Sequence, residues 1–268
     1  MSLFIDNSKR KYVIGLVHLL PLPGTPLHQE GNFKKSLEKA LRDVSALQKG
    51  GADGCLLQTS ERIYPSGDDT DYARLASFAI IAHEVRKAVG KEFKLGVQMM
   101  WNCITPSLAV AKACEADFTR NTVMFGTSTS PYGLISANPE KVQAYRKKLG
   151  LENLTMIAEI DGYHYTWFGP EISIQEKAAM AIKVGADAVE IVHPDEAVNN
   201  QMVHDIKKSN PAIRVVLGGK TNLENVSRRM KEADAVLVGA YFEKEGWGGF
   251  VDEERVRDYV AAVRAIEG

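Results

Sequence analysis

Eight short apolar runs, each followed by a helical pattern, constrain the fold of this chain more than any other feature. Apolar runs of this length, bounded by small or polar residues, are typical of buried strands, and the patterns between them are typical of amphipathic helices. The predicted strands are Tyr12–Val17, Asp53–Gln58, Phe93–Met99, Asp117–Val123, Leu154–Ile160, Asp187–Val192, Ile213–Leu217 and Asp234–Val238. The clearest helical patterns are Phe33–Lys49, Tyr72–Val89, Pro139–Leu149, Ile174–Val184, Glu196–Lys208 and Glu253–Ile266.

A recurring corner connects several of these units. A small residue or glycine ends the helix and an aspartate opens the next strand, as in Gly51-Ala52-Asp53-Gly54, Glu115-Ala116-Asp117, Gly185-Ala186-Asp187-Ala188 and Glu232-Ala233-Asp234-Ala235. Such corners imply right-handed crossovers into a parallel sheet. Eight evenly spaced units, and no GxGxxG motif after the first strand, favour a closed (β/α)8 barrel over an open doubly wound sheet.

Length and composition agree with one barrel domain over residues 1–268. The chain has 268 residues and no proline-rich linker, and one such barrel typically takes ~250 residues. We interpret residues 1–3 and 267–268 as vector remnants. The 33 basic and 34 acidic residues leave a net charge of -1, so charge gives no reason to expect nucleic acid or an anionic membrane as a partner.

Further compositional features predict a cytoplasmic protein. No apolar run reaches the ~18 residues of a membrane span, and the charged first ten residues lack a signal-peptide core. The three cysteines have no paired metal-ligand spacing and read as reduced thiols. A homo-oligomer is compatible with all of these features.

Two consecutive strand–glycine–helix units near the end of the chain predict an anion site. They are Val215-Val216-Leu217-Gly218-Gly219-Lys220-Thr221 and Ala235-Val236-Leu237-Val238-Gly239-Ala240. They fall at the seventh and eighth strands, where barrels of this kind often bind phosphate. The predicted phosphate-binding residues are Gly218, Gly219, Lys220, Gly239 and Ala240; the alternative is that the glycines only make tight turns.

Side-chain alternation selects the candidate catalytic residues. In Met156–Asp161, Glu159 and Asp161 share one face, and because a carboxylate is costly against the helix layer, that face should point into the barrel. The same reasoning turns Glu190 inward. Of Arg120 and Asn121 only one can point inward, and we favour Arg120. The predicted catalytic residues are His18, Arg120, Glu159 and Glu190; the alternative is a purely structural ion pair.

Other polar residues gather at the same end of the predicted strands. We expect them to bind substrate: Gln58, Gln98, Asn102, Asp161, His164 and His193. The histidines 18, 164 and 193 together with Glu190 could hold a catalytic divalent metal. However, no two of them have a tight ligand spacing, and His18 starts almost across the barrel from the others. We therefore predict no cofactor and no tightly bound metal, with a metal-dependent hydrolase as the alternative.

Two stretches of the chain resemble the BtpA/SgcQ family. The first is Gly15-Leu16-Val17-His18-Leu19-Leu20-Pro21-Leu22-Pro23-Gly24-Thr25-Pro26, and the second begins at Gly219-Lys220-Thr221-Asn222 and runs through Val251–Val256. The resemblance implies a (β/α)8 barrel allied to ribulose-phosphate-binding barrels, in a family linked to photosystem I biogenesis or to sugar utilisation. The middle departs from the family pattern at Gln58–Arg62 and Gln98–Asn102, which implies a different substrate.

These observations predict an enzyme that binds a small phosphorylated metabolite, most simply a sugar phosphate. The predicted reaction is proton transfer next to a carbonyl, as in an isomerase, an epimerase or an aldolase-type lyase. Glu159 or Glu190 would be the base, and His18 or Arg120 would polarise the oxygen. A non-catalytic assembly factor that keeps the barrel is the third alternative.

Overall fold

A computed structural model of the protein, which describes residues 10–266, shows a closed barrel of eight parallel strands. Around the barrel the order is β1, β2, β3, β4, β7, β9, β10 and β11, and β11 pairs again with β1. Their bounds are β1 Tyr12–His18, β2 Gly54–Gln58, β3 Lys94–Gln98, β4 Phe118–Asn121, β7 Thr155–Gly162, β9 Ala188–Val192, β10 Arg214–Gly218 and β11 Ala235–Val238. The predicted (β/α)8 fold is confirmed; the proposed vector remnants lie outside the described residues.

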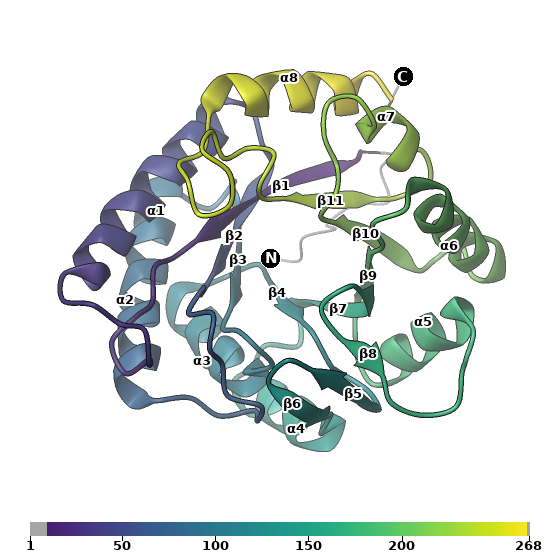
Figure 1. Ribbon diagram of the computed structural model, residues 1–268, viewed down its shortest axis with the longest axis horizontal. Helices are drawn as coiled ribbons and strands as arrows, with labels where there is room; N and C mark the ends of the chain where they lie inside the picture. Colours follow the sequence, from purple (N-terminus) through teal and green to yellow (C-terminus); the bar gives the residue numbers. More distant parts are fainter. Residues whose placement is uncertain (1–9, 267–268) are drawn as a thin grey trace.

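Helices form an outer ring around these strands (Figure 1). Their bounds are α1 Asn32–Lys49, α2 Tyr72–Val89, α3 Ile104–Cys114, α4 Pro139–Lys148, α5 Ile174–Lys183, α6 Glu196–Ser209, α7 Val226–Arg229 and α8 Glu253–Arg264. The main core lies between the ring and the strands, whereas Ile14, Leu56, Phe118 and Val216 help to fill the barrel itself. None of the helices in the described part of the chain is long and apolar enough to cross a membrane.

The loops after β4 and β7 form a small antiparallel sheet that the sequence did not predict. It consists of β5 (Thr127–Ser130), β6 (Gly133–Ser136) and β8 (Thr166–Trp167), in the order β6-β5-β8 (Figure 1). Trp101 packs below it, with its ring centroid 5.7 Å from that of Tyr165 and 6.2 Å from that of Tyr132. The two loops therefore pair with each other and stiffen this side of the mouth.

The four aspartates of the recurring corners fasten neighbouring strands at the amino end of the barrel. Asp117 shows the pattern: its backbone N–H donates to the Leu95 carbonyl oxygen at 2.7 Å, and its Oδ2 accepts the Leu95 N–H at 2.8 Å. Asp53, Asp187 and Asp234 bind Val13, Met156 and Val215 in the same way.

Each of these aspartates also pairs with a cation on a helix, which for Asp117, Asp187 and Asp234 precedes the first strand of the pair and for Asp53 is the last helix, α8. Arg86 of α2 donates to Asp117 at 2.5 Å, and Arg264 of α8 donates to Asp53 at 2.7 Å. In the same way, Arg146 of α4 forms an ion pair with Asp187, and Lys207 of α6 forms one with Asp234. The barrel is thus built from four units, each with two strands, one aspartate and one helix cation.

Replacing one of these aspartates should destabilise the barrel. In Asp117→Ala, the Leu95 N–H and the partly buried Arg86 each lose an acceptor, so the free energy of unfolding should fall by about 2–3 kcal/mol. Urea unfolding measures this loss. Asp258→Ala, which changes an exposed aspartate of α8, is the control and should stay within about 0.5 kcal/mol of the parent. Equal stability of the two variants would contradict a fastening role.

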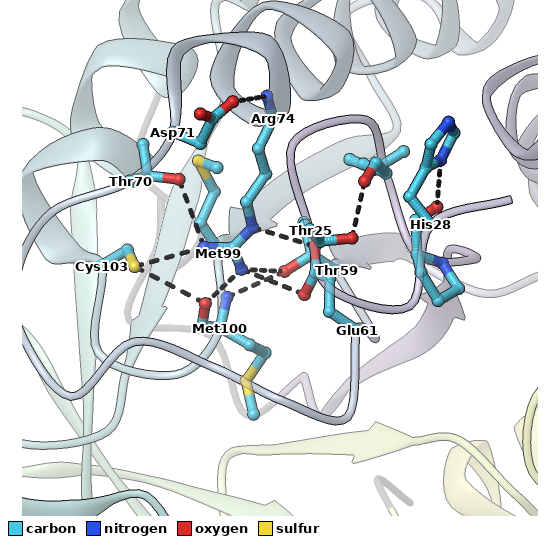
Figure 2. Close-up of polar contacts among 12 residues, drawn as sticks. Thr25, His28, Thr59, Glu61, Thr70, Asp71, Arg74, Met99, Met100 and Cys103 are labelled. Atoms are coloured by element: carbon cyan, nitrogen blue, oxygen red, sulfur yellow. Dashed lines mark hydrogen bonds and ion pairs between the residues drawn. The ribbon is translucent and has the colours of Figure 1, made fainter.

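At the opposite end of the barrel, Arg74 of α2 fixes the loops that follow β2 and β3. Its guanidinium donates to Glu61 Oε1 at 2.9 Å and to Thr59 Oγ1 at 3.0 Å, and it also contacts the Met100 carbonyl oxygen (Figure 2). Both Arg74 and Glu61 are buried. The ion pair therefore holds Met100 and Trp101 at the mouth, where both line the cavity described next.

Candidate functional site

A cavity of about 530 Å³ opens at the carboxyl end of the barrel strands. All four predicted catalytic residues and all five predicted phosphate-binding residues line it. Other residues of its wall are Leu16, Gln58, Met100, Trp101, Thr122, Tyr163, His164, Val192, Thr221, Asn222, Leu237, Val238, Tyr241 and Trp247. Its position is the one where barrels of this type carry their chemistry.

Arg120 joins the two inward-facing carboxylates on one wall of this cavity. Its Nε donates to Glu190 Oε2 at 2.6 Å and its Nη2 donates to Glu159 Oε2 at 2.8 Å. Glu159 and Glu190 are opposite each other on the paired strands β7 and β9, and both are buried. The third arm of Arg120 donates to Gln98 Oε1 at 3.3 Å. Of the two residues weighed on β4, Arg120 is the one that faces the cavity.

One oxygen of each carboxylate remains without a partner. Among the described residues, no protein group donates to Glu159 Oε1 or to Glu190 Oε1, although both atoms are buried. Burial raises the pKa of Glu159 to about 8, because the lowering effect of Arg120 is outweighed by desolvation and by the nearby Glu190 and Asp161. Glu159 therefore titrates close to neutral pH, as a group that gives and takes protons must.

Gly218 makes room for one of these carboxylates. A Cβ at this position would lie 2.0 Å from Glu190 Oε1 and 2.9 Å from Val192 Cγ2. Any side chain at residue 218 would therefore displace Glu190. Gly218, which the sequence predicted to bind phosphate, is therefore needed to leave space for Glu190.

Next to the carboxylates in the barrel order, the loops after β10 and β11 present backbone groups to the cavity. Gly219 and Lys220 have φ values of 64° and 54°, so two successive residues adopt the left-handed conformation. Among residues 10–266, the N–H groups of Lys220, Thr221 and Ala240 donate to no protein acceptor. Successive free N–H groups in such a turn form a concave site that suits an anion.

Lys220 adds a positive charge at the rim of this anion-compatible turn. Its Nζ lies 5.2 Å from the ring centroid of Tyr163, whose side chain is half exposed. The side chain is thus held beside the cavity by a cation–π contact. Burial, together with Arg120 and Lys220, lowers the pKa of the neighbouring His164, which favours the neutral form of that ring.

His18 forms a buried pair with Glu243, a residue that the sequence did not select. His18 Nδ1 lies 2.8 Å from Glu243 Oε1, and both side chains are buried. Glu243 Oε2 accepts the Gly248 N–H at 3.0 Å, so the same carboxylate also holds the loop that carries Trp247 over the cavity. A carboxylate on Nδ1 fixes the orientation of the imidazole ring and leaves Nε2 available. Separated from His18 by 225 positions, Glu243 gave no local signal of this pairing.

The prediction that Asp161 shares the inward face of Glu159 was wrong. A bulge in β7 shifts the register, so that Glu159 pairs with Glu190 but Asp161 pairs with Ile191. One extra residue reverses the alternation, and Asp161 lines a second, smaller cavity instead.

Two other predicted substrate-binding residues lie outside the main cavity. Asn102 uses both ends of its amide on the backbone of Val123, donating to the carbonyl oxygen at 3.2 Å and accepting the N–H at 2.8 Å. His193 binds the backbone of Asp195 through Nδ1. By contrast, Gln58 and His164 line the cavity, and Gln98 reaches it through Arg120.

The three histidines do not assemble into one cluster. Within residues 10–266, no group of three or more His, Cys, Asp or Glu side chains is placed to hold a metal ion. His18 and His164 line the cavity whereas His193 does not. The arrangement instead offers a carboxylate–arginine centre, a histidine–glutamate pair and an anion-compatible turn.

Comparison with known proteins places the chain in a family. The model of the BtpA family matches residues 9–265. An uncharacterised protein of Archaeoglobus fulgidus is 33% identical, over 95% of this chain and 99% of its own length. The photosystem I biogenesis protein BtpA of Synechocystis is 25% identical, over 98% of this chain and 91% of its own.

Among solved structures, phosphoribosyl anthranilate isomerase from Thermus thermophilus has the same fold. Its TM-score is 0.56 at 13% identity, over 95% of this chain and 99% of that chain. At such low identity the likeness concerns the fold alone. The family match covers nearly the whole chain and agrees with the motifs at Gly15–Pro26 and Gly219–Asn222. This protein belongs to the BtpA family.

Proposed function

We propose that this protein is an enzyme that binds a small phosphorylated metabolite, such as a sugar phosphate, and transfers a proton next to its carbonyl group. The proposal rests mainly on one observation, the composition of the main cavity. A single cavity of about 530 Å³ has an ionisable carboxylate centre on one wall and an anion-compatible turn on another. A cavity of this size accommodates a small metabolite.

The anion-compatible turn at Gly219, Lys220 and Thr221, together with the N–H of Ala240 in the loop after β11, is the proposed phosphate site. Its free N–H groups and the Lys220 ammonium would bind the phosphate oxygens. With the phosphate held there, the rest of the metabolite would extend past β9 toward Glu159 on β7 and Arg120 on β4. The isomerase fold neighbour, whose name includes a phosphoribosyl group, supports this choice by analogy.

Glu159 is the proposed proton-transfer group and Arg120 the proposed electrostatic stabiliser. The carboxylate of Glu159 would remove the proton from the carbon next to the carbonyl and become a carboxylic acid. Negative charge would then develop on the carbonyl oxygen, and Arg120 or the available Nε2 of His18 would stabilise it. Glu190 keeps Arg120 in place from the other side.

A second candidate function is a non-catalytic assembly role, as the name of the Synechocystis relative suggests. Its supporting observation is that Glu159, Arg120 and Glu190 form internal ion pairs, as purely structural groups also do. The cavity beside these ion pairs, with two unpartnered carboxylate oxygens, favours the enzyme.

Solvent deuterium tests the proposed reaction without knowledge of the product. The protein is incubated in D₂O with a panel of phosphorylated aldoses, ketoses and keto acids, and loss of the C–H signal next to the carbonyl is followed by NMR. Enzyme-dependent loss in at least one compound is the expected result. Absence of exchange throughout the panel, in protein that binds those compounds, would favour the assembly role.

The phosphate site gives a prediction about binding. Gly219→Val would place a side chain 3.3 Å from Val192 Cγ1 and toward the Tyr163 hydroxyl, and Lys220→Ala would remove the cation. Each variant should weaken binding of phosphorylated ligands by about 10–100-fold, the value of one or two charge-assisted hydrogen bonds. Calorimetric titration measures the loss.

Gly133→Val is the matched control for the strain of valine at positive φ. Gly133 has a φ of 107° and no atom near its absent Cβ, and it lies on the β5–β6 hairpin outside the cavity. This variant should bind like the parent. Unchanged affinity in both Gly219→Val and Lys220→Ala would remove the phosphate assignment.

A further inference from the structure

A second cavity, of about 40 Å³, lies next to the small sheet, at the carboxyl ends of β4 and β7. We call it the rear chamber; its polar lining residues are Thr122, Ser128, Glu159, Asp161, Tyr165 and Lys177. Glu159 is thus the carboxylate that lines both the main cavity and the rear chamber.

The two oxygens of Glu159 have different surroundings. Oε2 accepts from Arg120 at the main cavity, whereas Oε1 is buried without a protein partner. Oε1 points toward Gly162, where a Cβ would lie 2.2 Å from it and 2.9 Å from Tyr165 Cε1. The Tyr165 hydroxyl is also buried and unpartnered. Two orphaned polar groups therefore converge beside a residue that has no side chain.

The rear chamber is large enough and polar enough for water. One water needs about 10–15 Å³ of cavity space and several polar partners, and the chamber offers about 40 Å³ together with Glu159, Tyr165 and Asp161. Buried polar groups that lack protein partners are usually satisfied by ordered water.

Asp161 connects this chamber with the outside. The bulge in β7 turns its side chain away from the barrel interior, and the residue is only partly buried. The negative charge of Asp161 acts on the groups inside the chamber and contributes to the raised pKa of both Glu159 and Tyr165. Lys177 of α5 lines the same chamber and supplies a cation there.

From these contacts we infer that Glu159 exchanges its proton with solvent through the rear chamber, by way of water and the Asp161 carboxylate. The inference rests on the proposed function, in which Glu159 takes a proton from the substrate. The route bypasses the main cavity, so Glu159 can lose that proton while a ligand still fills the front.

The steps conserve protons and need no other reactant. The Oε1–H bond of protonated Glu159 breaks as a chamber water accepts the proton. That water passes a proton to a carboxylate oxygen of Asp161, and Asp161 releases a proton to bulk water. Tyr165 keeps its proton, because burial and the surrounding carboxylates raise its pKa well above the ordinary value. It acts as a positioning residue that orients the water.

The test compares exchange with turnover on a phosphorylated compound that the D₂O screen identifies. For that compound, the ratio of deuterium incorporation to product formation reports how often the abstracted proton escapes before it is returned. In Asp161→Asn this ratio should fall by about a hundredfold, the lower end of what a positioned proton-transfer group contributes. In Tyr165→Phe, which removes only the hydroxyl that orients the water, the ratio should fall by a smaller factor. Glu171→Gln, an exposed carboxylate outside both cavities, is the control and should keep the parental ratio.

An unchanged ratio in both chamber variants, with turnover intact, would overturn the rear route and leave the proposed function standing. If no compound in the panel exchanges, the proposed function fails, and a crystal structure of the protein tests the rear route separately.

In that crystal structure, ordered water that bridges Glu159 Oε1 and Asp161 would support the rear route, and a chamber without water would overturn it. Carbon-13 NMR of the Glu159 carboxyl adds a measurement free of substrate, because the titration midpoint should fall in Asp161→Asn. A midpoint that stays constant would also count against the route.

Discussion

Glu159→Gln should abolish exchange of substrate hydrogen with D₂O while leaving phosphate binding intact. Glutamine keeps the shape of the side chain and an oxygen for Arg120, but it cannot accept the proton. We expect a loss of about 10²–10⁴-fold in exchange rate, the usual contribution of a positioned proton-transfer group. The rate is measured by NMR with the compound found in the panel. Glu171→Gln, which changes an exposed carboxylate outside both cavities, is the control and should keep the parental exchange rate.

The pH dependence of the parent provides a second measurement of the same residue. The pKa of Glu159 is raised from 4.5 to about 8, so its basic form accumulates as pH rises toward 8, and the exchange rate should rise with it. Stability should change in the opposite sense. The folded state holds a proton that the unfolded state releases between 4.5 and about 8, so this residue's contribution to stability is full below the lower value and is lost as pH rises through the upper one.

In Glu159→Gln both the pH-dependent rise in rate and this contribution to the stability profile should vanish. A rate profile identical to that of the parent would show that another group transfers the proton. Because the control Glu171→Gln changes an exposed carboxylate, both of its profiles should match those of the parent.

Arg120→Met should cause the largest loss of stability of any single change at the site. The substitution leaves Glu159 and Glu190 buried without their common cation. Removing one partner of a buried ion pair costs about 3–5 kcal/mol. The expected loss in the free energy of unfolding is of this size at neutral pH and is measured by urea unfolding.

The loss in free energy of unfolding caused by Arg120→Met should be smaller at low pH. Without Arg120, which lowers the pKa of Glu159, this buried carboxyl binds its proton still more tightly than in the unfolded chain, so the variant is most stable at low pH and loses stability as pH rises. The triple variant Arg120→Met, Glu159→Gln, Glu190→Gln carries no buried charge at this position and should recover most of the loss. A pH-independent penalty that the triple variant does not relieve would indicate a packing defect instead.

The fold could be predicted from the sequence because its signals are local and repeated. Eight apolar runs, helical spacing and the Ala-Asp corners each involve a few neighbouring residues, and all of them indicate the same parallel barrel. The loops after the seventh and eighth strands were found for the same reason, since Gly219 lies directly after its strand.

The parts of the site that escaped prediction depend on irregular or distant contacts. Strict alternation placed Glu159 correctly but failed two residues later, because the bulge in β7 reverses the orientation of Asp161. Glu243 meets His18 only after the barrel closes. The small sheet of β5, β6 and β8 forms between two loops, and neither loop alone has the apolar alternation of a strand.

The aspartate corners imply where this chain could be cut and rejoined. Each corner ties two strands to the helix before them, and the fourth tie uses Arg264 of the last helix to hold Asp53 beside the first strand pair. A side-chain contact between the last helix and the first strand pair therefore joins the two ends of the described chain, beside the pairing of β1 with β11. Circularly permuted chains opened ahead of α2, α4 or α6 would keep each of the four units, two strands with their aspartate and helix cation, in one continuous stretch of chain. Chains opened between the two strands of one unit would divide that unit. We therefore expect the first kind of permuted chain to fold more stably than the second, as it would if each unit were an independent building block of the barrel.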